Sequence, residues 1–170
     1  MTKAIKFLDK TEIKVLELCE TNKISISGVK YSRGHDADAM EANVKVGNSI
    51  KGYVYDDSWG GDLEFGGKEI NRFTDKLNDV ISKAPKYTFL GTEMEYCSDT
   101  VVSLLIKDAE FKKDCKKKIV VLCRKSTKDN ARVDTFEYNV KYQPKFDKNV
   151  LVDMKKEGYV EYEIVNKRYI

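Results

Sequence analysis

Strict alternation of apolar and polar residues in adjoining stretches constrains this fold more than any other sequence feature. In AMEANVKVGN, Met40, Ala42, Val44 and Val46 occupy every second position, and Glu41, Asn43 and Lys45 lie between them. A period of two is the side-chain period of a β-strand with one buried face. SIKGYVYDD follows after the short turn sequence VGNS, and the preceding KISISGVKYS also alternates. The sequence therefore predicts three antiparallel strands with a shared buried face.

Helical periodicity appears elsewhere along the chain. The segment 68–83, KEINRFTDKLNDVISK, carries one apolar stripe and is followed by Pro85, so it predicts an amphipathic helix. Residues 9–20 predict a short helix, and another begins at Ser98 or Asp99, both common N-cap residues. Residues 147–159 predict a short helix that ends at Gly158.

The second half of the chain adds three predicted strands. Residues 118–125 form a continuous apolar run, residues 133–142 alternate, and residues 159–165 form a last strand. On the second of these, the residues expected on one face are Phe136, Tyr138, Val140 and Tyr142. Together these elements predict an α+β fold with mainly antiparallel sheets and packed helices.

The domain organisation follows from length and from the placement of glycine. A chain of 170 residues suits a single α+β domain, residues 1–170. Eight of the ten glycines lie between Gly28 and Gly67. This uneven distribution divides the chain into a glycine-punctuated part, residues 1–90, and a lysine-rich part, residues 91–170. These parts are expected to share one core or to form two small subdomains.

Composition and charge exclude several classes of protein. Apolar residues make up 41% and charged residues 35%, which is typical of a globular chain. No apolar run approaches the ~20 residues that span a bilayer, and the first residues lack a signal-peptide core. We therefore expect a cytoplasmic protein without membrane contact. The net charge of +3, with acids and bases interspersed, argues against a dedicated nucleic-acid binder.

The cysteines and the single histidine give no metal-binding pattern. Cys19, Cys97, Cys115 and Cys123 are far apart and form no C-x-x-C pair. The one histidine cannot complete a zinc pattern with them. We expect four reduced cysteines, mostly packed as small apolar residues, and no cofactor.

The loop SRGHDADAME, residues 32–41, has three open interpretations. His35, Asp36 and Asp38 could bind a divalent metal or act as an acid–base pair in a metal-dependent hydrolase. They could also form a recognition surface. Gly, His and Asp are equally what turn geometry selects between two strands. The sequence contains no phosphate-binding loop, dinucleotide motif or nucleophile elbow that would favour catalysis.

The stretch YVYDDSWGGDLEFGG, residues 53–67, holds the only tryptophan, two glycine pairs and four acidic residues. Its glycines predict a tight turn between strands. Asp56, Asp57 and Asp62 could bind a cation together with the acids of the 32–41 loop, provided that both loops lie at the same end of the sheet. Trp59 either covers the turn or anchors a partner.

The densest basic run is KDAEFKKDCKKK, residues 107–118. Lysines at the end of a helix favour the negative end of its dipole, so the run is typical of a solvated helix terminus. The alternative is a nucleic-acid or nucleotide site with nearby tyrosines that stack bases. Its candidate residues are Lys112, Lys113, Lys116, Lys117, Lys118 and Arg124.

One family resemblance covers about two thirds of the chain. Residues 28–65 are similar to the N-terminal part of a family of small, uncharacterised phage and prophage proteins, in which a glycine-pair turn follows a β-strand. The matching positions are Gly52, Val54, Asp56, Gly60 and Gly61. Residues 104–125 also resemble this family, in which a lysine-rich helix leads into an apolar strand. The resemblance implies a protein made inside a bacterial host cell, and it brings no catalytic residues.

These observations favour a non-enzymatic protein that binds and inhibits a host protein. One concrete form is a counter-defence inhibitor of the anti-CRISPR type. Aromatic and arginine side chains dominate binding energy in protein interfaces. The candidate anchors are Trp59, Tyr53, Tyr55, Tyr31 and Arg33. Nucleic-acid binding and metal-dependent hydrolysis remain the alternatives, and the sequence leaves the partner's identity and the oligomeric state open.

Overall fold

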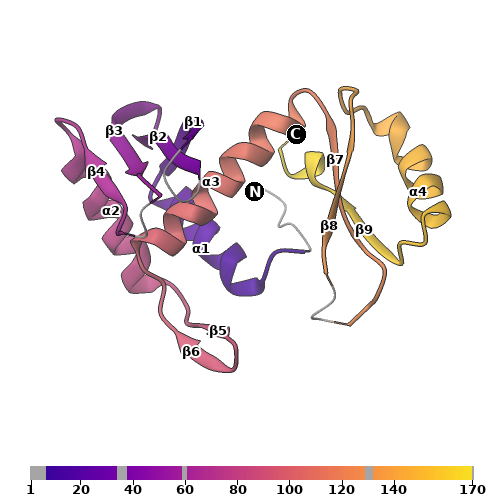
Figure 1. Cartoon of the computed structure of the whole chain (residues 1–170), viewed down its shortest axis with the longest axis horizontal. Helices are drawn as coiled ribbons and strands as arrows, with labels where there is room; N and C mark the ends of the chain where they lie inside the picture. The colour runs from indigo at the N-terminus through magenta and orange to yellow at the C-terminus, as the bar shows by residue number, and fades with distance from the viewer. Residues whose placement is uncertain (1–6, 34–37, 59–60, 129–131, 170) are drawn as a thin grey trace. The chain divides into compact units, whose positions relative to one another are not determined.

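The computed structural model describes residues 7–33, 38–58, 61–128 and 132–169. The described part of the chain combines four α-helices with antiparallel sheets, which confirms the predicted α+β class (Figure 1). The chain divides into two compact units, Lys10–Ala109 and Met1–Asp9 with Glu110–Ile170. The division expected near residue 90 therefore falls inside the larger unit.

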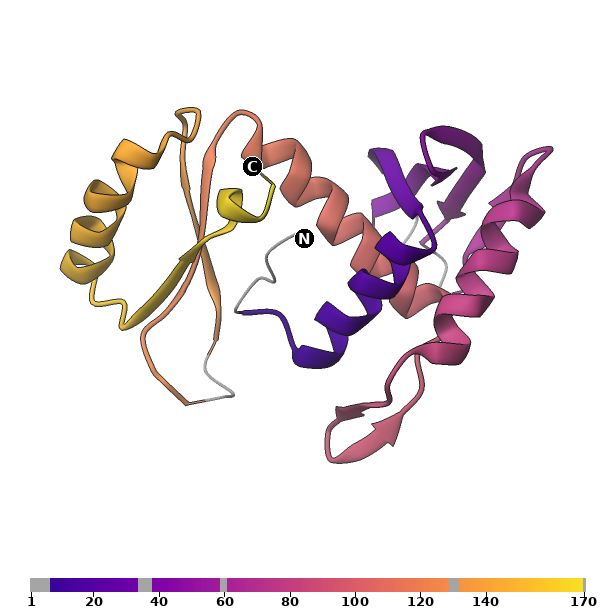
Figure 2. The same cartoon turned by 180° about the vertical axis from the view of Figure 1, so that it is seen from behind.

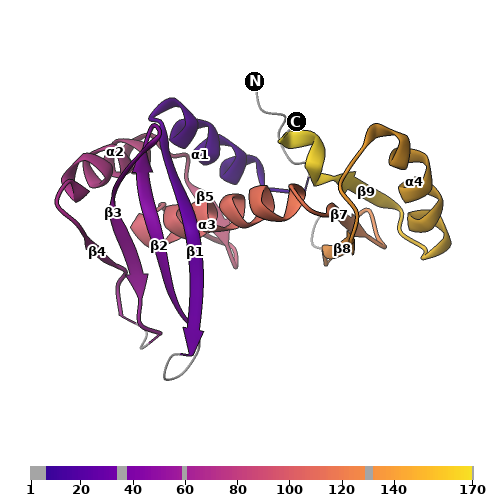
Figure 3. The ribbon, with the colours of Figure 1, turned by 90° about the horizontal axis from the view of Figure 1, so that it is seen from above.

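The larger unit contains a four-stranded meander. Strands β1 (Ile24–Arg33), β2 (Asp38–Val46), β3 (Ser49–Asp56) and β4 (Glu64–Gly66) follow one another in sheet order, and each pairs antiparallel with the next (Figure 3). This arrangement confirms the three predicted strands and adds a short fourth one. Met40, Ala42 and Val44 are buried and Glu41 is exposed, as the alternation predicts.

Helices cover the buried face of this sheet. Helix α1 (Lys10–Thr21) contacts β1, and helix α2 (Ile70–Lys83) contacts β1, β2 and β3. Phe73, Leu77 and Val80 are the fully buried part of the stripe predicted for α2. Helix α3 (Ser98–Cys115) begins in the larger unit and continues past its boundary at residue 109.

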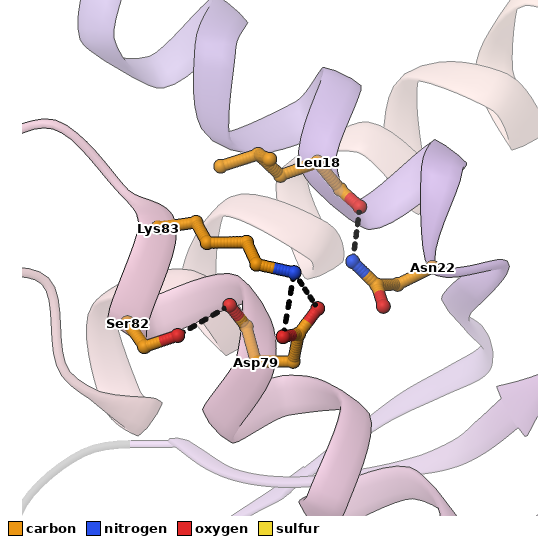
Figure 4. A network of polar contacts seen from close by, with 5 residues as sticks. All are labelled: Leu18, Asn22, Asp79, Ser82 and Lys83. Carbon is orange, nitrogen blue, oxygen red and sulfur yellow. Dashed lines mark hydrogen bonds and ion pairs between the residues drawn. The ribbon is translucent and has the colours of Figure 1, made fainter.

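Polar contacts finish the ends of α1 and α2, which lie side by side (Figure 4). Asn22 donates from Nδ2 to the carbonyl of Leu18 at 3.1 Å. Lys83 Nζ donates to Asp79 Oδ2 at 2.8 Å, one turn earlier in α2. The Lys83 ammonium, with a smaller contribution from Asn22, holds the pKa of the Asp79 carboxyl below its usual value.

A bulge in β1 changes which face its second half presents. Ser27 pairs with Asn43 and Lys30 with Glu41, so Gly28 and Val29 together lie opposite Ala42. Gly28 has a φ of 64°, and a Cβ there would lie 2.9 Å from Asn43 Nδ2. Positive φ is what this type of bulge requires, and glycine supplies it at low cost.

Gly52 and the second glycine pair, Gly66 and Gly67, lie where β3 and β4 approach closely. A Cβ on Gly52 would lie within 3.0 Å of the carbonyl oxygen of Gly66, a distance that Cβ atoms essentially never show. A Cβ on Gly67 would lie 2.6 Å from the Gly52 Cα. By contrast, nothing lies within 4 Å of a Cβ on Gly61. Close backbone approach between β3 and β4 therefore explains why glycines recur here.

A short hairpin that the sequence did not predict follows α2. Strands β5 (Tyr87–Phe89) and β6 (Thr92–Met94) pair around the two-residue turn Leu90–Gly91. Two three-residue strands carry too little alternation to be recognised, and the turn lacks the usual Asn-Gly or Asp-Gly sequence. The hairpin extends beyond the ends of α2 and α3 (Figures 1 and 2).

The smaller unit places one helix on a three-stranded sheet. Strands β7 (Ile119–Arg124), β8 (Asp134–Tyr138) and β9 (Glu161–Ile164) are antiparallel in the order β8-β7-β9, and α4 (Asp147–Lys156) lies beside them (Figure 2). Two 3₁₀ segments, η1 (Pro144–Phe146) and η2 (Val165–Arg168), complete it. One buried cluster of this unit consists of Ile119, Val121, Cys123, Val150, Met154 and Ile164.

Two predicted element ends in this unit can be compared with the structure: the end of β8 was predicted too late, and the end of α4 was predicted correctly. The prediction for residues 133–142 was too long: β8 ends at Tyr138, and Val140 is 46% exposed instead of buried. The Val140 N–H bonds back to the Tyr138 carbonyl at 2.7 Å, so the chain turns there. The helix end at Gly158 is confirmed, with a φ of 78° and the Tyr159 N–H bonded to the Met154 carbonyl.

Two tyrosine hydroxyls connect α4 to β8 and to the segment that precedes η1. Tyr138 donates to Asp153 Oδ2 and Tyr142 to Asp147 Oδ1, both at 3.0 Å. Burial, together with the neighbouring carboxylate, raises the pKa of each tyrosine to about 12. Both phenols therefore stay protonated donors up to strongly alkaline pH, which marks them as structural residues.

The buried side chain of Asn166 in η2 bonds to three backbone groups of this unit. Its Oδ1 accepts the Val120 N–H at 2.9 Å, and its Nδ2 donates to the carbonyls of Cys115 at 3.0 Å and Lys118 at 2.8 Å. The side chain is 2% exposed. One amide thus joins the end of α3, the turn after it and the start of β7.

Candidate functional site

The face of the four-stranded sheet that carries the side chains alternate to the buried ones is the best-formed candidate surface; we call it the outer face. One row of paired residues crosses all four strands and contains no charge. It consists of Ser27, Asn43, Tyr53 and Gly66. Tyr53 is 47% exposed, while Ser27 and Asn43 are half-buried. The row is therefore accessible and polar without being ionic.

A charged row borders the uncharged one. It consists of Lys30, Glu41, Tyr55 and Glu64, paired in that order across the sheet. Lys30, Glu41 and Glu64 are exposed, and Tyr55 is half-buried. An uncharged centre beside a charged margin is the usual composition of a protein interface.

Local packing positions Tyr53 on this face. A Cβ on Gly66 would lie 2.9 Å from Tyr53 Cε1, which shows that the tyrosine ring covers the bare glycine backbone. An aromatic ring over a glycine on the neighbouring strand stabilises the pairing. Tyr53 thus has a structural role in addition to its exposed edge.

The structure brings only part of the predicted partner-binding set together. Tyr53 and Tyr55 share the outer face. The bulge at Gly28 places Tyr31 opposite Met40 and Arg33 opposite Asp38, on the side of the sheet that carries the buried residues. Tyr31 is 54% exposed there, near the end of the sheet. Trp59 lies outside the described residues.

The strand ends that flank the two acidic loops lie at the same end of the sheet. In this meander β1 and β3 both end at the edge of the sheet where β2 begins, and Asp56 at the end of β3 pairs with Met40 near the start of β2 (Figure 3). Asp56 accepts the Ser58 N–H at 2.9 Å in a turn of its own. His35 and Asp36 lie outside the described residues, and no group of acids, histidine or cysteines suited to a metal occurs among the residues described. A metal-dependent hydrolase stays a prediction.

The predicted nucleic-acid residues lie in two places: the lysines around the end of α3 and the turn before β7, and Arg124 at the far end of β7. Lys112 and Lys113 lie in the last turn of α3, and Lys116 and Lys117 in the exposed turn after it. Lys118 binds Glu137 at 2.6 Å. Arg124 is ion-paired with Glu161. Arg124 lies six residues further along β7, roughly 20 Å from Lys118. The lysines therefore gather, whereas Arg124 lies apart from them.

Cys97 is the exposed thiol of the four free cysteines. Helix α3 begins at Ser98, one of the two predicted starts, but the Val101 N–H bonds to the Cys97 carbonyl, so the N-cap residue is Cys97 and not Ser98 or Asp99. Thr100 Oγ1 accepts the Cys97 N–H at 2.9 Å. The backbone N–H of Thr100, and then its hydroxyl, stabilise the thiolate and hold the Cys97 pKa below its usual value. Burial raises the pKa of Cys19 and Cys115 to about 12.

We expect Cys97 to be the first thiol alkylated by iodoacetamide, with a pH profile whose midpoint lies below that of a free cysteine, because the thiolate is the nucleophile. Thr100→Val removes the hydroxyl that stabilises the thiolate, so the midpoint should move to higher pH. Peptide mass spectrometry over a pH series measures this. Ser103→Val, which removes an exposed hydroxyl from the same helix, should leave the profile unchanged. An equal profile for the wild type and Thr100→Val would contradict the assignment.

Comparison with known proteins gives no relative: no family model matches the chain, and neither a curated protein nor a solved structure matches it significantly. No helix in the described part of the chain is long and apolar enough to cross a membrane.

Proposed function

We propose that this chain acts by binding another protein through the outer face of its four-stranded sheet. The observation that carries the proposal is the uncharged row of Ser27, Asn43, Tyr53 and Gly66 beside the charged row with Tyr55. Tyrosine, serine, asparagine and glycine are the residues that antibody binding loops use, because tyrosine supplies contact area at low entropic cost and the small polar residues adapt their hydrogen bonds.

The charges on this face support a protein partner over a nucleic acid. The residues that border the uncharged row include Lys30, Glu41 and Glu64 on one side and Lys45 on the other, so positive charges are in no excess that would attract phosphates. The lysines at 112, 113, 116 and 117 keep nucleic-acid binding as a second candidate, since all four are exposed. We place it second because Lys118 and Arg124 are each ion-paired with a glutamate.

The nature of the partner rests on the sequence resemblance alone. The similarity to phage proteins supports a host protein as the partner and inhibition as the outcome. A counter-defence inhibitor of the anti-CRISPR type is the most specific form of this proposal.

A single charge placed in the uncharged row tests the proposal. Ser27→Lys puts an ammonium beside Asn43 on the half-buried outer face. Because the centre of an interface tolerates an unpaired charge poorly, we expect the affinity for a partner protein captured by the wild-type chain to fall at least tenfold. The measurement is a pull-down with the full-length chain, followed by calorimetry with the purified partner.

Asn78→Lys is the matched control, because it adds the same charge at an exposed position of α2. It should bind like the wild type. Equal affinity for wild type and Ser27→Lys, with both chains folded, would exclude the outer face as the binding surface. A wild-type chain that retains no protein at low salt would contradict protein binding itself.

A further inference from the structure

The β5–β6 hairpin presents apolar side chains at its tip. Leu90 is 90% exposed, Phe89 61% and Met94 42%. Phe89 and Leu90 lie at the turn of this projecting element, whereas Met94 pairs with Tyr87 at the other end of the hairpin (Figure 2). Two adjacent, strongly exposed apolar side chains at the tip of a projecting element are a candidate interaction site.

The backbone conformation at the tip is unfavourable for Leu90. Leu90 has a φ of 49° and Gly91 a φ of 81°, the pattern of a type I′ turn. Asparagine, aspartate or glycine is preferred at the first position, because positive φ crowds larger side chains. Leucine in this position lowers the stability of the fold, and its side chain is not buried within the chain. Strain retained without a folding benefit points to a function outside the fold.

The base of the hairpin is held firmly, which suits a presented anchor. The rings of Tyr87 and Tyr96 lie 4.8 Å apart between centroids. Tyr96 is 8% exposed, and its hydroxyl lies 3.1 Å from Thr11 Oγ1 in α1. Both strands of the hairpin are thus joined to α1 at their base. A contact made by the tip would therefore cost little entropy for ordering the hairpin.

Charges on the flanks indicate what the tip contacts. Lys86 lies 3.3 Å from Glu93 and 3.8 Å from Glu95, so one lysine faces two glutamates. Glu95 is the more exposed of the two, with an 81% exposed side chain. This excess negative charge is repelled by an anionic bilayer surface. It is complementary to a pocket with a basic rim.

We infer that the tip, Phe89 and Leu90, inserts into an apolar pocket with a basic rim on a partner protein. The inference rests on the proposed function, because it takes the partner to be a protein. It adds the hairpin tip as a second binding surface besides the outer face. Phe89 and Leu90 fill the pocket, and Glu95 meets its rim. The partner is thereby defined by a small apolar hollow bordered by arginine or lysine.

Leu90→Asn tests this without harming the fold. It creates an Asn-Gly turn, the favoured sequence for this geometry, so the melting temperature should stay equal or rise. Proteins retained by the immobilised wild-type chain are purified, and their affinity for each variant is measured by calorimetry. We expect Leu90→Asn to weaken binding at least tenfold and to make the heat-capacity change of binding less negative, because less apolar surface is buried.

Two matched variants sharpen the result. Val152→Asn alters a 62% exposed valine in α4, where valine and asparagine have similar helix propensity, and it should bind like the wild type. Glu95→Gln should weaken binding several-fold at low salt and have less effect at high salt.

Each other outcome overturns the inference. Equal affinity of Leu90→Asn and wild type does so and leaves the proposed function standing if Ser27→Lys still weakens binding. A wild-type chain that retains no protein overturns both. Leu90-dependent sedimentation with phosphatidylglycerol or phosphatidylcholine vesicles assigns the tip to a membrane instead. Concentration-dependent dimerisation that Leu90→Asn abolishes assigns it to a second copy of the chain.

Discussion

Asn166→Ala is expected to destabilise the smaller unit by roughly 2 to 4 kcal/mol, because it leaves three backbone groups without their partner. The Val120 N–H is buried, and the Cys115 and Lys118 carbonyls are partly buried. An unsatisfied buried polar group costs ~1 to 3 kcal/mol, and water reaching the carbonyls reduces the total. Urea denaturation of the full chain measures the loss. Hydrogen exchange at the Val120 amide locates it.

Asn166→Asp separates hydrogen bonding from size. The carboxylate keeps an acceptor for Val120 but replaces the Nδ2 group, which donates both other bonds, with one oxygen that faces the carbonyls of Cys115 and Lys118. A buried, unpaired charge adds to that loss, so Asn166→Asp should be at least as destabilising as Asn166→Ala. Asn149→Ala, at an exposed position of α4, should be neutral or slightly stabilising because alanine favours the helix. Near-native stability of Asn166→Asp would mean that the amide donors contribute little.

Periodicity predicted the regular elements of this fold and failed where single residues redirect the backbone. The strands around Val44 and the helix around Phe73 have long apolar patterns, and both are confirmed. The β5–β6 hairpin has strands of three residues and a Leu-Gly turn, so neither period nor turn chemistry revealed it. Asn166 gave no signal, because one buried amide in a polar stretch resembles any surface asparagine.

The candidate site shows the same limit. Tyr53 and Tyr55 could be assigned to one face by alternation, and the structure places both there. Tyr31 and Arg33 could not, because the bulge at Gly28 shifts every later residue of β1 by one position relative to β2. A glycine inside an alternating strand was the available signal for that bulge. The register itself depends on pairing with β2, which one strand's sequence does not contain.

The glycine-rich stretch leads to the second large prediction. Gly52→Ala should destabilise the larger unit by roughly 3 kcal/mol or more, because its new Cβ overlaps the Gly66 carbonyl, and strained overpacking typically costs ~1 to 3 kcal/mol when side chains can yield. Here the obstructing atom belongs to the backbone of the paired strand and cannot rotate away. Ile70 Cδ1, at 3.0 Å from the same Cβ, closes the other direction. The clash should separate β4 from β3, and with it the Tyr53–Gly66 contact on the outer face.

Gly61→Ala isolates the steric cause of this effect. It makes the same chemical change nine residues later, where no atom of the described residues lies within 4 Å of the new Cβ. Its effect should stay within about 0.5 kcal/mol, or be slightly stabilising because alanine restricts the unfolded chain. Thermal and urea unfolding of the full chain compare the two variants. Similar losses for both would show that glycine is needed here for backbone freedom. A loss confined to Gly52→Ala would show that Gly52 is needed so that β3 and β4 can approach.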